Sequence, residues 1–475
     1  MRRRAARTCP NCRRLQAEVD SLRAQLQELQ AVVAGLQQQL AAARKDSSTS
    51  SKPPSSDIVK PPKTPPHAQQ TARSPGGQPG HPKHEREPFP PELLDDVFDY
   101  RLDCCPDCGG RLRPTGFDPH VVQQVDLPAV PLSIVEYHRH EGYCRRCDKV
   151  HHAALPVGVA RGGLLGPRLT TLVAYLKGVC HASYSTVRKF LRDVVGLTVS
   201  RGQLAKVIGK VSAALERPYR ELLADLPEQG RLNVDETSHK DSGDLLWTWC
   251  FRAELYTLFK IDPTRSGDVL LEVLGAEFDG VLGCDCFSAY RRYMRECDVR
   301  VQFCLAHLIR EVKFLTTLPD RRDRAYGERL REALRQLFAL IHRREHMPPT
   351  EFERRLRAAR AEVLRQGAHD VPPTKAASKL ARRLQKYGES YFLFVTTPGV
   401  EPTNNLAEQA IRFVVIDRHI TQGTRGEAGQ RWCERIWTAL ATCGQQGRSV
   451  FAYLGAVVQA YFAGGEGPSL LPGDG

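Results

Sequence analysis

The sequence lacks any apolar run long enough to cross a bilayer, which requires about 20 consecutive apolar residues. Its most apolar late segment, residues 451–463, is much shorter. An apolar leader is also absent, because Arg2, Arg3 and Arg4 precede a polar stretch. We therefore expect a cytoplasmic protein without membrane contact. In that reducing compartment its 15 cysteines are expected to be thiols or metal ligands, not disulfides.

Acidic residues are the minority charge. The chain has 54 Asp and Glu against 68 Lys and Arg, a formal net charge of +14 over 475 residues. A chain of this length exceeds one compact core, so several domains are expected. A strongly basic protein commonly binds a polyanion, because neutralising phosphates releases condensed counterions. The charge indicates a nucleic-acid partner, and the alternative is a cationic enzyme without one.

Residues 12–44 carry a heptad pattern. The a positions are β-branched or Leu and the d positions are all Leu, which favours a parallel two-stranded coiled coil. We expect a homodimer or higher oligomer through this helix, and the alternative is a helix packed on its own domain. The a series is Val19, Leu26, Val33 and Leu40, and the d series is Leu15, Leu22, Leu29 and Leu36.

The rest of the chain divides by composition. Residues 45–91, rich in Pro, Gly and Ser, predict a disordered linker. Strand-like runs near 231–262 and 280–285 predict an α/β core. The expected order is a zinc-ribbon domain at 92–155, a helical DNA-binding region at 160–226, a core at 227–430 with a helical hairpin inserted at about 320–390, and a C-terminal helical segment at 431–475.

Two Cys-x-x-Cys motifs stand 35 residues apart, Cys105–Cys108 and Cys144–Cys147. Tetrahedral zinc needs four soft ligands, and each motif supplies two thiolates. The pattern predicts a structural Zn²⁺ in a zinc ribbon, which contributes on the order of 10 kcal/mol to folding. Alternative ligands are Cys104 in place of Cys105, and His138, His140, His151 and His152.

Cys9 and Cys12 form a third pair that cannot complete a four-ligand site within one chain. We expect two free thiols here. The alternative is a shared site between two pairs at the head of a dimeric coiled coil.

Residues 184–194 have helical periodicity and are followed by Gly196 and then Ser200, a residue type that caps helices. Helix, short turn and capped basic helix is the outline of a helix-turn-helix. The residues expected to face DNA are Arg201, Gln203 and Lys206. A plain helical bundle is the alternative.

Three acids have the context of a metal-dependent phosphodiester site. Asp235 and Asp285 each end an apolar strand-like run, and Glu408 begins a helical segment. Two Mg²⁺ ions about 3.5–4 Å apart require hard oxygen ligands that converge from different elements. The alternatives are ordinary turn aspartates and a helix cap, because Asn405 and Glu408 have capping-box spacing.

Several motifs occur in a characteristic order. They are the zipper-like helix, Ser51-Lys-Pro-Pro-Ser-Ser-Asp57, Gly77-Gln-Pro-Gly-His81, the double cysteine knuckle, Val234-Asp235-Glu236-Thr237, Asp285 with Ser288-Ala289-Tyr290, Cys304-x-x-His307 and Pro402-Thr-Asn-Asn-x-x-Glu408. With these motifs the chain resembles, nearly end to end, the transposases of the insertion sequence 66 family, a branch of the DDE transposases.

The resemblance implies a ribonuclease-H-like core, a mixed sheet flanked by helices, in which Asp235, Asp285 and Glu408 are the catalytic and metal-binding acids. It implies two Mg²⁺ ions, or Mn²⁺, at that trio. It further implies double-stranded DNA as partner, both at the terminal inverted repeats and at the target. Cleavage there frees 3′-hydroxyls that attack target DNA. Accessory proteins of the same element and a bacterial, nucleoid-associated location are also implied.

Three further residues are candidates for auxiliary roles. His307 and Arg310 are expected to position phosphate or the attacking water, and the alternative for His307 is a packed histidine. Arg412, one turn after Glu408, neutralises the scissile phosphate or pairs with the glutamate. Cys284 and Cys286, which flank the second acid, depart from the family pattern and predict inhibition by softer metals.

The expected fold class is therefore a multidomain α/β protein with a coiled coil, a zinc ribbon, a helix-turn-helix region and a ribonuclease-H-like core. The expected function is DNA transposition by strand cleavage and strand transfer. Two other functions fit the same residues. One is a non-catalytic zinc-ribbon and helix-turn-helix DNA-binding regulator, and the other is a metal-dependent nuclease that cuts without joining.

Overall fold

The computed structural model describes residues 10–45, 88–98, 107–108, 111, 121–125 and 131–473. The chain forms two compact units. One comprises Met1–Pro61, Tyr137–Asp193 and Leu197–Gly475, and the other comprises Pro62–Glu136 and Val194–Gly196. Most of the linker expected at 45–91 lies outside the described residues. In the smaller unit, Gln123 exchanges two hydrogen bonds with the backbone of Phe89, at 2.7 and 2.9 Å.

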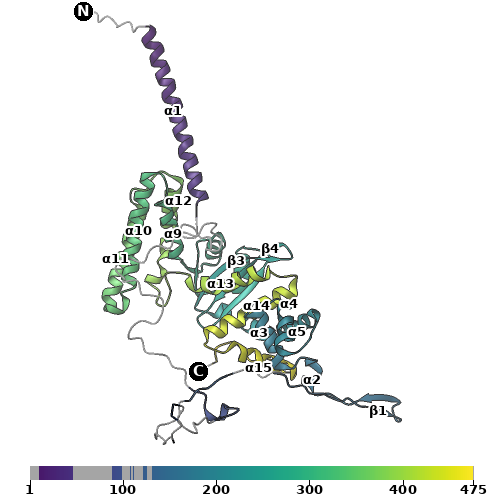
Figure 1. Cartoon of the computed structure of the whole chain (residues 1–475). Coiled ribbons are helices and arrows are strands. Elements are labelled where there is room, and N and C mark those ends of the chain that lie inside the picture. The colour runs from purple at the N-terminus through teal and green to yellow at the C-terminus, as the bar shows by residue number, and fades with distance from the viewer. Residues whose placement is uncertain are drawn as a thin grey trace, which may run out of the picture. The chain divides into compact units, whose positions relative to one another are not determined.

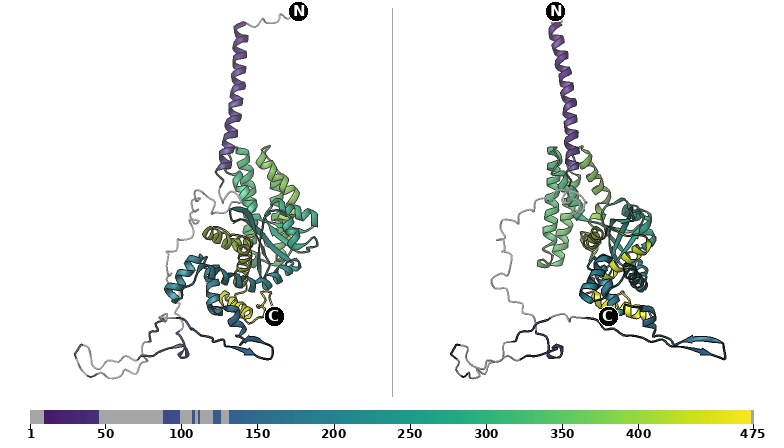
Figure 2. Two further views of the ribbon diagram at one scale, coloured as in Figure 1. Left: turned by 90° about the vertical axis from the view of Figure 1, so that its right-hand side faces the viewer. Right: turned by 45° about the vertical axis from the view of Figure 1, so that its right-hand side comes forward.

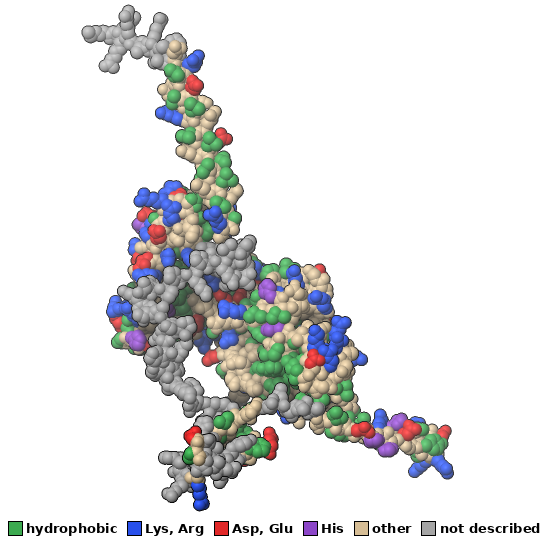
Figure 3. Space-filling view, in the orientation of Figure 1, with side chains coloured by type: hydrophobic (Ala, Val, Ile, Leu, Met, Phe, Trp, Pro, Cys, Tyr) green, Lys and Arg blue, Asp and Glu red, His purple; other side chains and the backbone are tan. Residues whose placement is uncertain are grey.

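The first helix, α1 (Pro10–Ala43), covers nearly the whole heptad segment (Figure 1). Its Ala, Leu, Gln and Glu residues have high helix propensity, and no proline interrupts it after its first residue. All eight heptad residues are exposed, from Val19 at 40% to Leu29 at 63%. Figure 3 shows these hydrophobic side chains along the helix. The apolar stripe therefore has no cover from within the described chain.

A short antiparallel hairpin carries the second cysteine motif. Strand β1 (Glu141–Cys144) pairs with β2 (Lys149–His152), with Cys144 opposite Lys149. The turn between them contains Cys147 and Asp148, which has a positive φ of 52°. The knuckle therefore sits at the tip of a ribbon, a position where backbone N–H groups are available to cysteine sulfurs.

Six helical segments occupy residues 157–225. Ser183 Oγ accepts the N–H of Thr186 at 3.1 Å, and Ser200 Oγ accepts the N–H of Gln203 at 3.1 Å, so two helices begin at serine caps. One face of α5 is buried through Leu204, Val207, Ile208 and Val211. The segments are α2 (Val157–Gly162), α3 (Pro167–Gly178), α4 (Tyr184–Phe190), a π-helical turn (Leu191–Val195), α5 (Arg201–Ala214) and α6 (Glu216–Asp225).

A five-stranded mixed sheet follows, in the order β5-β4-β3-β6-β7. The pairs β3–β4 and β4–β5 are antiparallel, whereas β3–β6 and β6–β7 are parallel. The sheet therefore combines a meander with two crossover strands. Its strands are β3 (Arg231–Asp241), β4 (Asp244–Arg252), β5 (Thr257–Asp262), β6 (Val281–Cys284) and β7 (Arg300–Phe303).

The two faces of β3 have different roles. Leu232, Val234 and Glu236 are buried on one face, and Asn233 and Asp235 alternate with them on the other. Helix α8 (Ser288–Cys297) packs on the face of Glu236, and it follows α7 (Asp268–Leu274) in the chain. Helix α13 (Asn405–Thr421) packs on the face of Asp235. The alternation of β3 therefore decides which acid faces which helix.

The outer edge of the sheet is closed by α14 (Glu427–Gln445), which lies along β5. The N–H groups of Thr257, Phe259 and Ile261 donate to side chains of this helix at 3.2, 3.0 and 2.7 Å. The acceptors are Thr442, Thr438 and Glu434, spaced one helical turn apart. An edge strand normally exposes its backbone N–H groups. Here side chains of α14 accept the hydrogen bonds that a neighbouring strand would otherwise accept.

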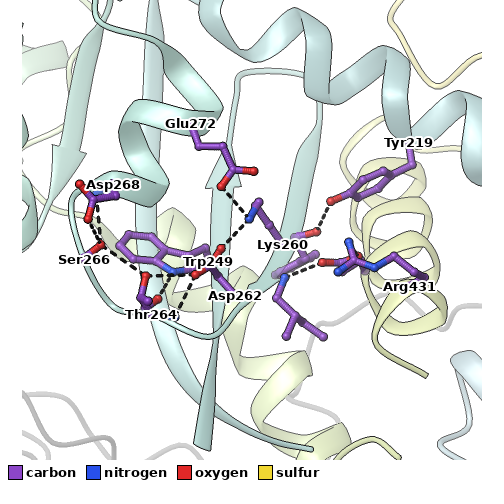
Figure 4. A network of polar contacts seen from close by, with 12 residues as sticks. Tyr219, Trp249, Lys260, Asp262, Thr264, Ser266, Asp268, Glu272 and Arg431 are labelled. Carbon is purple, nitrogen blue, oxygen red and sulfur yellow. Dashed lines mark hydrogen bonds and ion pairs between the residues drawn. The ribbon is translucent and has the colours of Figure 1, made fainter. Parts of the chain in front are cut away.

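Polar contacts continue along β5 (Figure 4). Lys260 lies 2.7 Å from Asp262 and 3.2 Å from Glu272. Burial raises the pKa of Glu434 to about 7, although the Ile261 N–H and Arg431 oppose that rise. Ion pairs between side chains on and beside β5 therefore stabilise this edge of the sheet.

The stretch between β7 and α13 is helical, as expected, but it contains three long helices after α9, not a two-helix hairpin. Figure 2 shows them as a layer beside the sheet. Leu330, Leu334 and Leu337 are buried in it, and Arg383 makes two hydrogen bonds to Glu311 at 2.8 and 2.6 Å. The helices are α9 (Leu305–Leu315), α10 (Arg321–Ile341), α11 (Pro349–Ala368) and α12 (Lys375–Tyr391).

Helix α15 (Val450–Phe462) ends the helical part of the chain and packs on α3. Its buried residues, such as Leu454 and Val457, face the helical region that precedes the sheet. Among the described residues, no helix has the length and apolar character of a membrane span.

Candidate active site

The parallel register brings Asp235 and Asp285 together. Asn233 of β3 is opposite Gly283 of β6, and each acid stands two residues further along its strand direction. Asp235 Oδ1 accepts the N–H of Glu236 at 2.9 Å, and Asp285 Oδ1 accepts the N–H of Phe287 at 2.9 Å. The first two acids therefore lie side by side, with Asp285 directly after the end of β6 and Asp235 in the middle of β3. The prediction that the first strand ends at Asp235 is wrong, because β3 continues to Asp241 in its pairing with β4.

Glu408 comes from α13, which is fixed on β3 at two points. Near its start, the buried Asn404 side chain donates from Nδ2 to the carbonyl oxygen of Val234 at 2.8 Å and accepts from Asn233 Nδ2 at 2.9 Å. Near its end, Arg418 donates to Thr237 Oγ1 at 3.1 Å. Glu408 lies between these anchors, on the same face of β3 as Asp235.

Glu408 does not act as a helix cap. The N-cap of α13 is Asn404, and no side chain accepts a hydrogen bond in the capping position. The carboxylate of Glu408 instead faces α9, with Oε2 3.3 Å from Arg310 and Oε1 3.6 Å from His307 Nδ1. The capping-box alternative is therefore wrong, because the helix begins one residue earlier and the glutamate side chain points toward α9.

The site concentrates negative charge. Burial raises the pKa of Asp235 well above its usual range, and Glu236, Asp285 and Glu408 raise it further. Burial and Glu236 also raise the pKa of Asp285, whereas His307 and Arg265 oppose that rise. Repulsion among enclosed carboxylates favours protonation until a cation relieves it. The set consists of hard oxygen donors from three elements, so it fits Mg²⁺ or Mn²⁺.

The residues predicted to have auxiliary roles have different surroundings in the structure. His307 and Arg310 both contact Glu408, and Arg310 also lies 3.3 Å from His307 Nε2. Arg412 is exposed, and the described residues contain no ion pair between it and Glu408. Cys284 is buried and Cys286 is half-buried, and burial raises the pKa of both thiols.

Sequence reasoning missed a buried ion pair behind the site. The Glu236 side chain is 1% exposed, and its Oε1 accepts from Arg265 Nε at 2.7 Å. Tyr290 donates to its other oxygen. The Arg265 guanidinium carbon lies 3.9 Å from the centroid of the Phe287 ring and 4.7 Å from the centroid of the Trp247 ring. The signal was present in the Asp235-Glu236 pair, because strand alternation places adjacent acids on opposite faces.

The expected zinc ligands are described only in part. Cys105 lies outside the described residues, as does the alternative Cys104. Cys108 is exposed in one compact unit, whereas Cys144 and Cys147 belong to the hairpin of the other. The backbone N–H groups of Cys147 and Arg146 lower the pKa of Cys144, which favours a metal-binding thiolate.

The residues expected to face DNA lie in the first turns of α5. Arg201 and Lys206 are exposed, and Gln203 is half-buried. The Cys9 and Cys12 side chains lie outside what the structure describes.

A mixed sheet with converging acids and, elsewhere in the chain, a hairpin that carries two cysteines are typical of a nucleic-acid-processing class of protein. Residues 162–431 match the family model described as "Transposase IS66 family", and residues 103–148 match "zinc-finger binding domain of transposase IS66". Residues 5–87 match a family of unknown function. The chain belongs to the IS66 family of transposases. It is a transposase with a zinc-finger domain and DNA as its partner.

Two relatives come from Sinorhizobium fredii (strain NBRC 101917 / NGR234). The chain is similar to the "Uncharacterized protein y4hP", with 23% identity over 399 residues that cover 75% of this chain and 70% of the relative. It is similar to the "Uncharacterized protein y4jD", with 22% identity over 404 residues that cover 78% of this chain and 77% of the relative.

Proposed function

We propose that this transposase uses Asp235, Asp285 and Glu408 to cut DNA at the terminal inverted repeats of its element and to join the freed 3′-hydroxyls to target DNA. The observation that carries the proposal is the convergence of three carboxylates from the middle of β3, the residue after β6 and the first turn of α13. Isolated structural acids do not require such mutual proximity, whereas a two-metal site does.

The strand order supports a ribonuclease-H-like core. Three antiparallel strands in a meander are followed by two parallel strands on the other side of β3. The first two acids lie on the central pair, β3 and β6, and the third arrives on a helix after the helical layer. This is the arrangement that the family resemblance implies.

The side chains around the trio have separate tasks. Two Mg²⁺ ions, or Mn²⁺, held by the acids supply an activated nucleophilic oxygen and stabilisation of the leaving oxygen. The hydrogen bond from Asn404 to the Val234 carbonyl oxygen fixes the position of Glu408 along β3. Arg310 donates to its Oε2 from the other side, and the His307 ring lies beside its Oε1. Arg412, exposed four residues after Glu408, is placed to meet DNA phosphate.

We assign DNA binding and zinc binding to other parts of the chain. Arg201, Gln203 and Lys206 at the start of α5 contact DNA, since the serine cap presents this basic turn at the surface. The zinc ribbon, with Cys105, Cys108, Cys144 and Cys147 as ligands, is structural because protein fills all four positions.

A second copy of the chain covers the apolar stripe of α1. Its eight exposed heptad residues suit a parallel coiled coil, which gives a homodimer or a higher oligomer. A dimer would present two DNA-binding regions to the two element ends. Accessory proteins of the same element complete the expected set of partners.

The test is a cleavage assay on the element's inverted repeats in Mg²⁺, with Asp285→Asn as the active-site variant. Asp279→Asn is the matched control, because the Asp279 side chain is fully exposed at 104%. We expect Asp285→Asn to bind the repeats and lose cleavage, and Asp279→Asn to retain both. Cleavage by Asp285→Asn at the wild-type rate would refute the assignment.

The same assay separates transposase from nuclease. Substrates that already end in a free 3′-hydroxyl are supplied with target DNA, and joined products are resolved on a gel. Joined product is expected for the wild type. Cleavage without any joining would identify a metal-dependent nuclease instead.

A further inference from the structure

A second cluster of metal-ligand side chains adjoins the trio. One ligand atom each of Cys304, His307 and Glu408 lies within 4.8 Å of the others. Cys304 is the N-cap of α9, His307 follows in its first turn, and Glu408 comes from α13. The three residues thus bring sulfur, imidazole nitrogen and carboxylate oxygen to one point.

Backbone contacts hold this point together. Leu305 N donates to the carbonyl oxygen of Pro402 at 2.9 Å, and Asn404 N donates to Cys304 Sγ at 3.1 Å. Cys304 N donates to the carbonyl oxygen of Cys284 at 2.8 Å. The starts of α9 and α13 are therefore fixed to each other by the fold itself.

Two polar atoms at this point have no hydrogen-bond partner among the described residues. They are His307 Nδ1 and Glu408 Oε1, which are both buried and lie 3.6 Å apart. That separation is too long for a hydrogen bond, and buried polar atoms are normally partnered. Two ligands of one tetrahedral Zn²⁺, each about 2.0–2.1 Å from the ion, are themselves about 3.3–3.4 Å apart. The pair therefore has nearly the separation that an ion needs.

The donor set identifies the class of metal. Mg²⁺ prefers oxygen ligands, whereas thiolate and imidazole select zinc and similar transition metals. Burial raises the pKa of the Cys304 thiol, and the N–H groups of Asn404 and His307 oppose that rise, so the thiol loses its proton as the metal binds. The spacing Cys-x-x-His also brings both ligands to one side of an ion, as in zinc knuckles.

We propose that Cys304, His307 and Glu408 form a Zn²⁺-type site with an open fourth position for water, and that an ion there takes Glu408 away from the Mg²⁺ site. Metal binding by the three residues is independent of the proposed function. The inhibitory consequence rests on that function, because it requires Glu408 to serve catalysis.

Arg310 opposes the binding of a metal ion by these three residues. Its guanidinium lies 3.3 Å from Glu408 Oε2 and 3.3 Å from His307 Nε2. An arginine only donates, so Nε2 accepts and the neutral imidazole carries its proton on Nδ1. Binding of Zn²⁺ at Nδ1 moves that proton to Nε2, displaces Arg310 from the ring and releases the thiol proton to solvent. The site should therefore bind zinc more weakly than a four-cysteine ribbon does.

The binding test uses Co²⁺ as a spectroscopic probe on the full chain, with the ribbon already loaded with zinc. A thiolate-to-cobalt absorption is expected for the wild type and for Cys297→Ser, a half-buried cysteine at the end of α8. Cys304→Ser should lose that absorption and weaken Co²⁺ binding by more than the 10–100-fold cost of an outer-shell partner. Arg310→Gln should bind Co²⁺ more tightly.

Folding is checked by circular dichroism, and His307→Gln provides a second variant in case Cys304→Ser unfolds. An unchanged cobalt spectrum in folded Cys304→Ser and His307→Gln would overturn the site. Added Zn²⁺ should inhibit Mg²⁺-dependent cleavage in the wild type and Cys297→Ser, and should inhibit Cys304→Ser less. A chain that binds Co²⁺ through Cys304 but never cleaves DNA would refute the proposed function and leave the metal site standing.

Discussion

Two glutamates on helices that pack against the sheet have opposite surroundings. Glu434 on α14 accepts the N–H of Ile261 at 2.7 Å and lies 2.7 Å from Arg431. Each glutamate keeps one buried oxygen without a hydrogen-bond partner among the described residues, so that feature does not separate them. Glu408 on α13 differs because it lies beside the carboxylates of Asp235 and Asp285. The contrast shows that a buried acid between a backbone N–H and an arginine supports the fold, whereas one beside other carboxylates points to a cation.

The comparison is tested most strongly by matched Glu→Gln changes. Glu408→Gln removes a negative ligand from the trio, so DNA cleavage in Mg²⁺ should fall at least about 100-fold, more than a typical outer-shell loss. Glu434→Gln keeps an oxygen for the Ile261 N–H and should leave cleavage nearly unchanged. Both rates are measured on the inverted-repeat substrate. Equal losses in the two variants would remove the distinction.

Asn404→Ala should affect both fold and catalysis, because it removes the side chain that ties α13 to β3. It leaves Asn233 and the Val234 carbonyl without partners, at about 1–3 kcal/mol each. Cleavage should fall by about 10–100-fold, as for other outer-shell residues. Urea unfolding and cleavage rates are measured together. Asn405→Ala, at the exposed neighbour, is the control, and matching behaviour would contradict the anchor role.

Glu434 should also make stability depend on pH. Its pKa in the folded protein, about 7, exceeds the ordinary 4.5, so the native state binds the extra proton between those values. Its contribution is full below pH 4.5 and is lost as pH rises through 7, a change of about 3 kcal/mol at most. Denaturation midpoints followed by tryptophan fluorescence should decline less steeply with pH in Glu434→Gln. Parallel curves for the two proteins would show that another group titrates.

The smallest expected effect is at Thr438, in the middle of the helix that closes β5. Thr438→Val removes the acceptor of the Phe259 N–H and keeps the side-chain shape, at a cost of about 1–3 kcal/mol. Urea unfolding measures this loss of unfolding free energy, and DNA cleavage by the folded variant should be unchanged. Thr421→Val, whose hydroxyl donates to its own helix at Asp417, is the control with a smaller expected loss.

Much of this architecture could be predicted from local pattern. The heptads, the helical stretch before α13, and the strand run that ends just before Asp285 all follow from periodicity and composition. The predicted end of the first strand at Asp235 was wrong, because pairing with β4 extends β3 to Asp241. The two-helix hairpin predicted at about 320–390 was wrong, because a third long helix, α12, follows the break at which Pro372 and Pro373 stand. The ion pair of Glu236 with Arg265 was not predicted, since its partners lie 29 residues apart and meet only through strand pairing.

The sequence by itself determined the residue types of the site, the cysteine spacing and the basic charge, because these are properties of composition and order. It left Glu408 indistinguishable from a helix cap apart from its motif. Tertiary structure decided that question through the parallel register of β3 and β6 and the Asn404 anchor of α13. The physical reason is that convergence of distant carboxylates depends on strand pairing and helix docking, which no local pattern encodes.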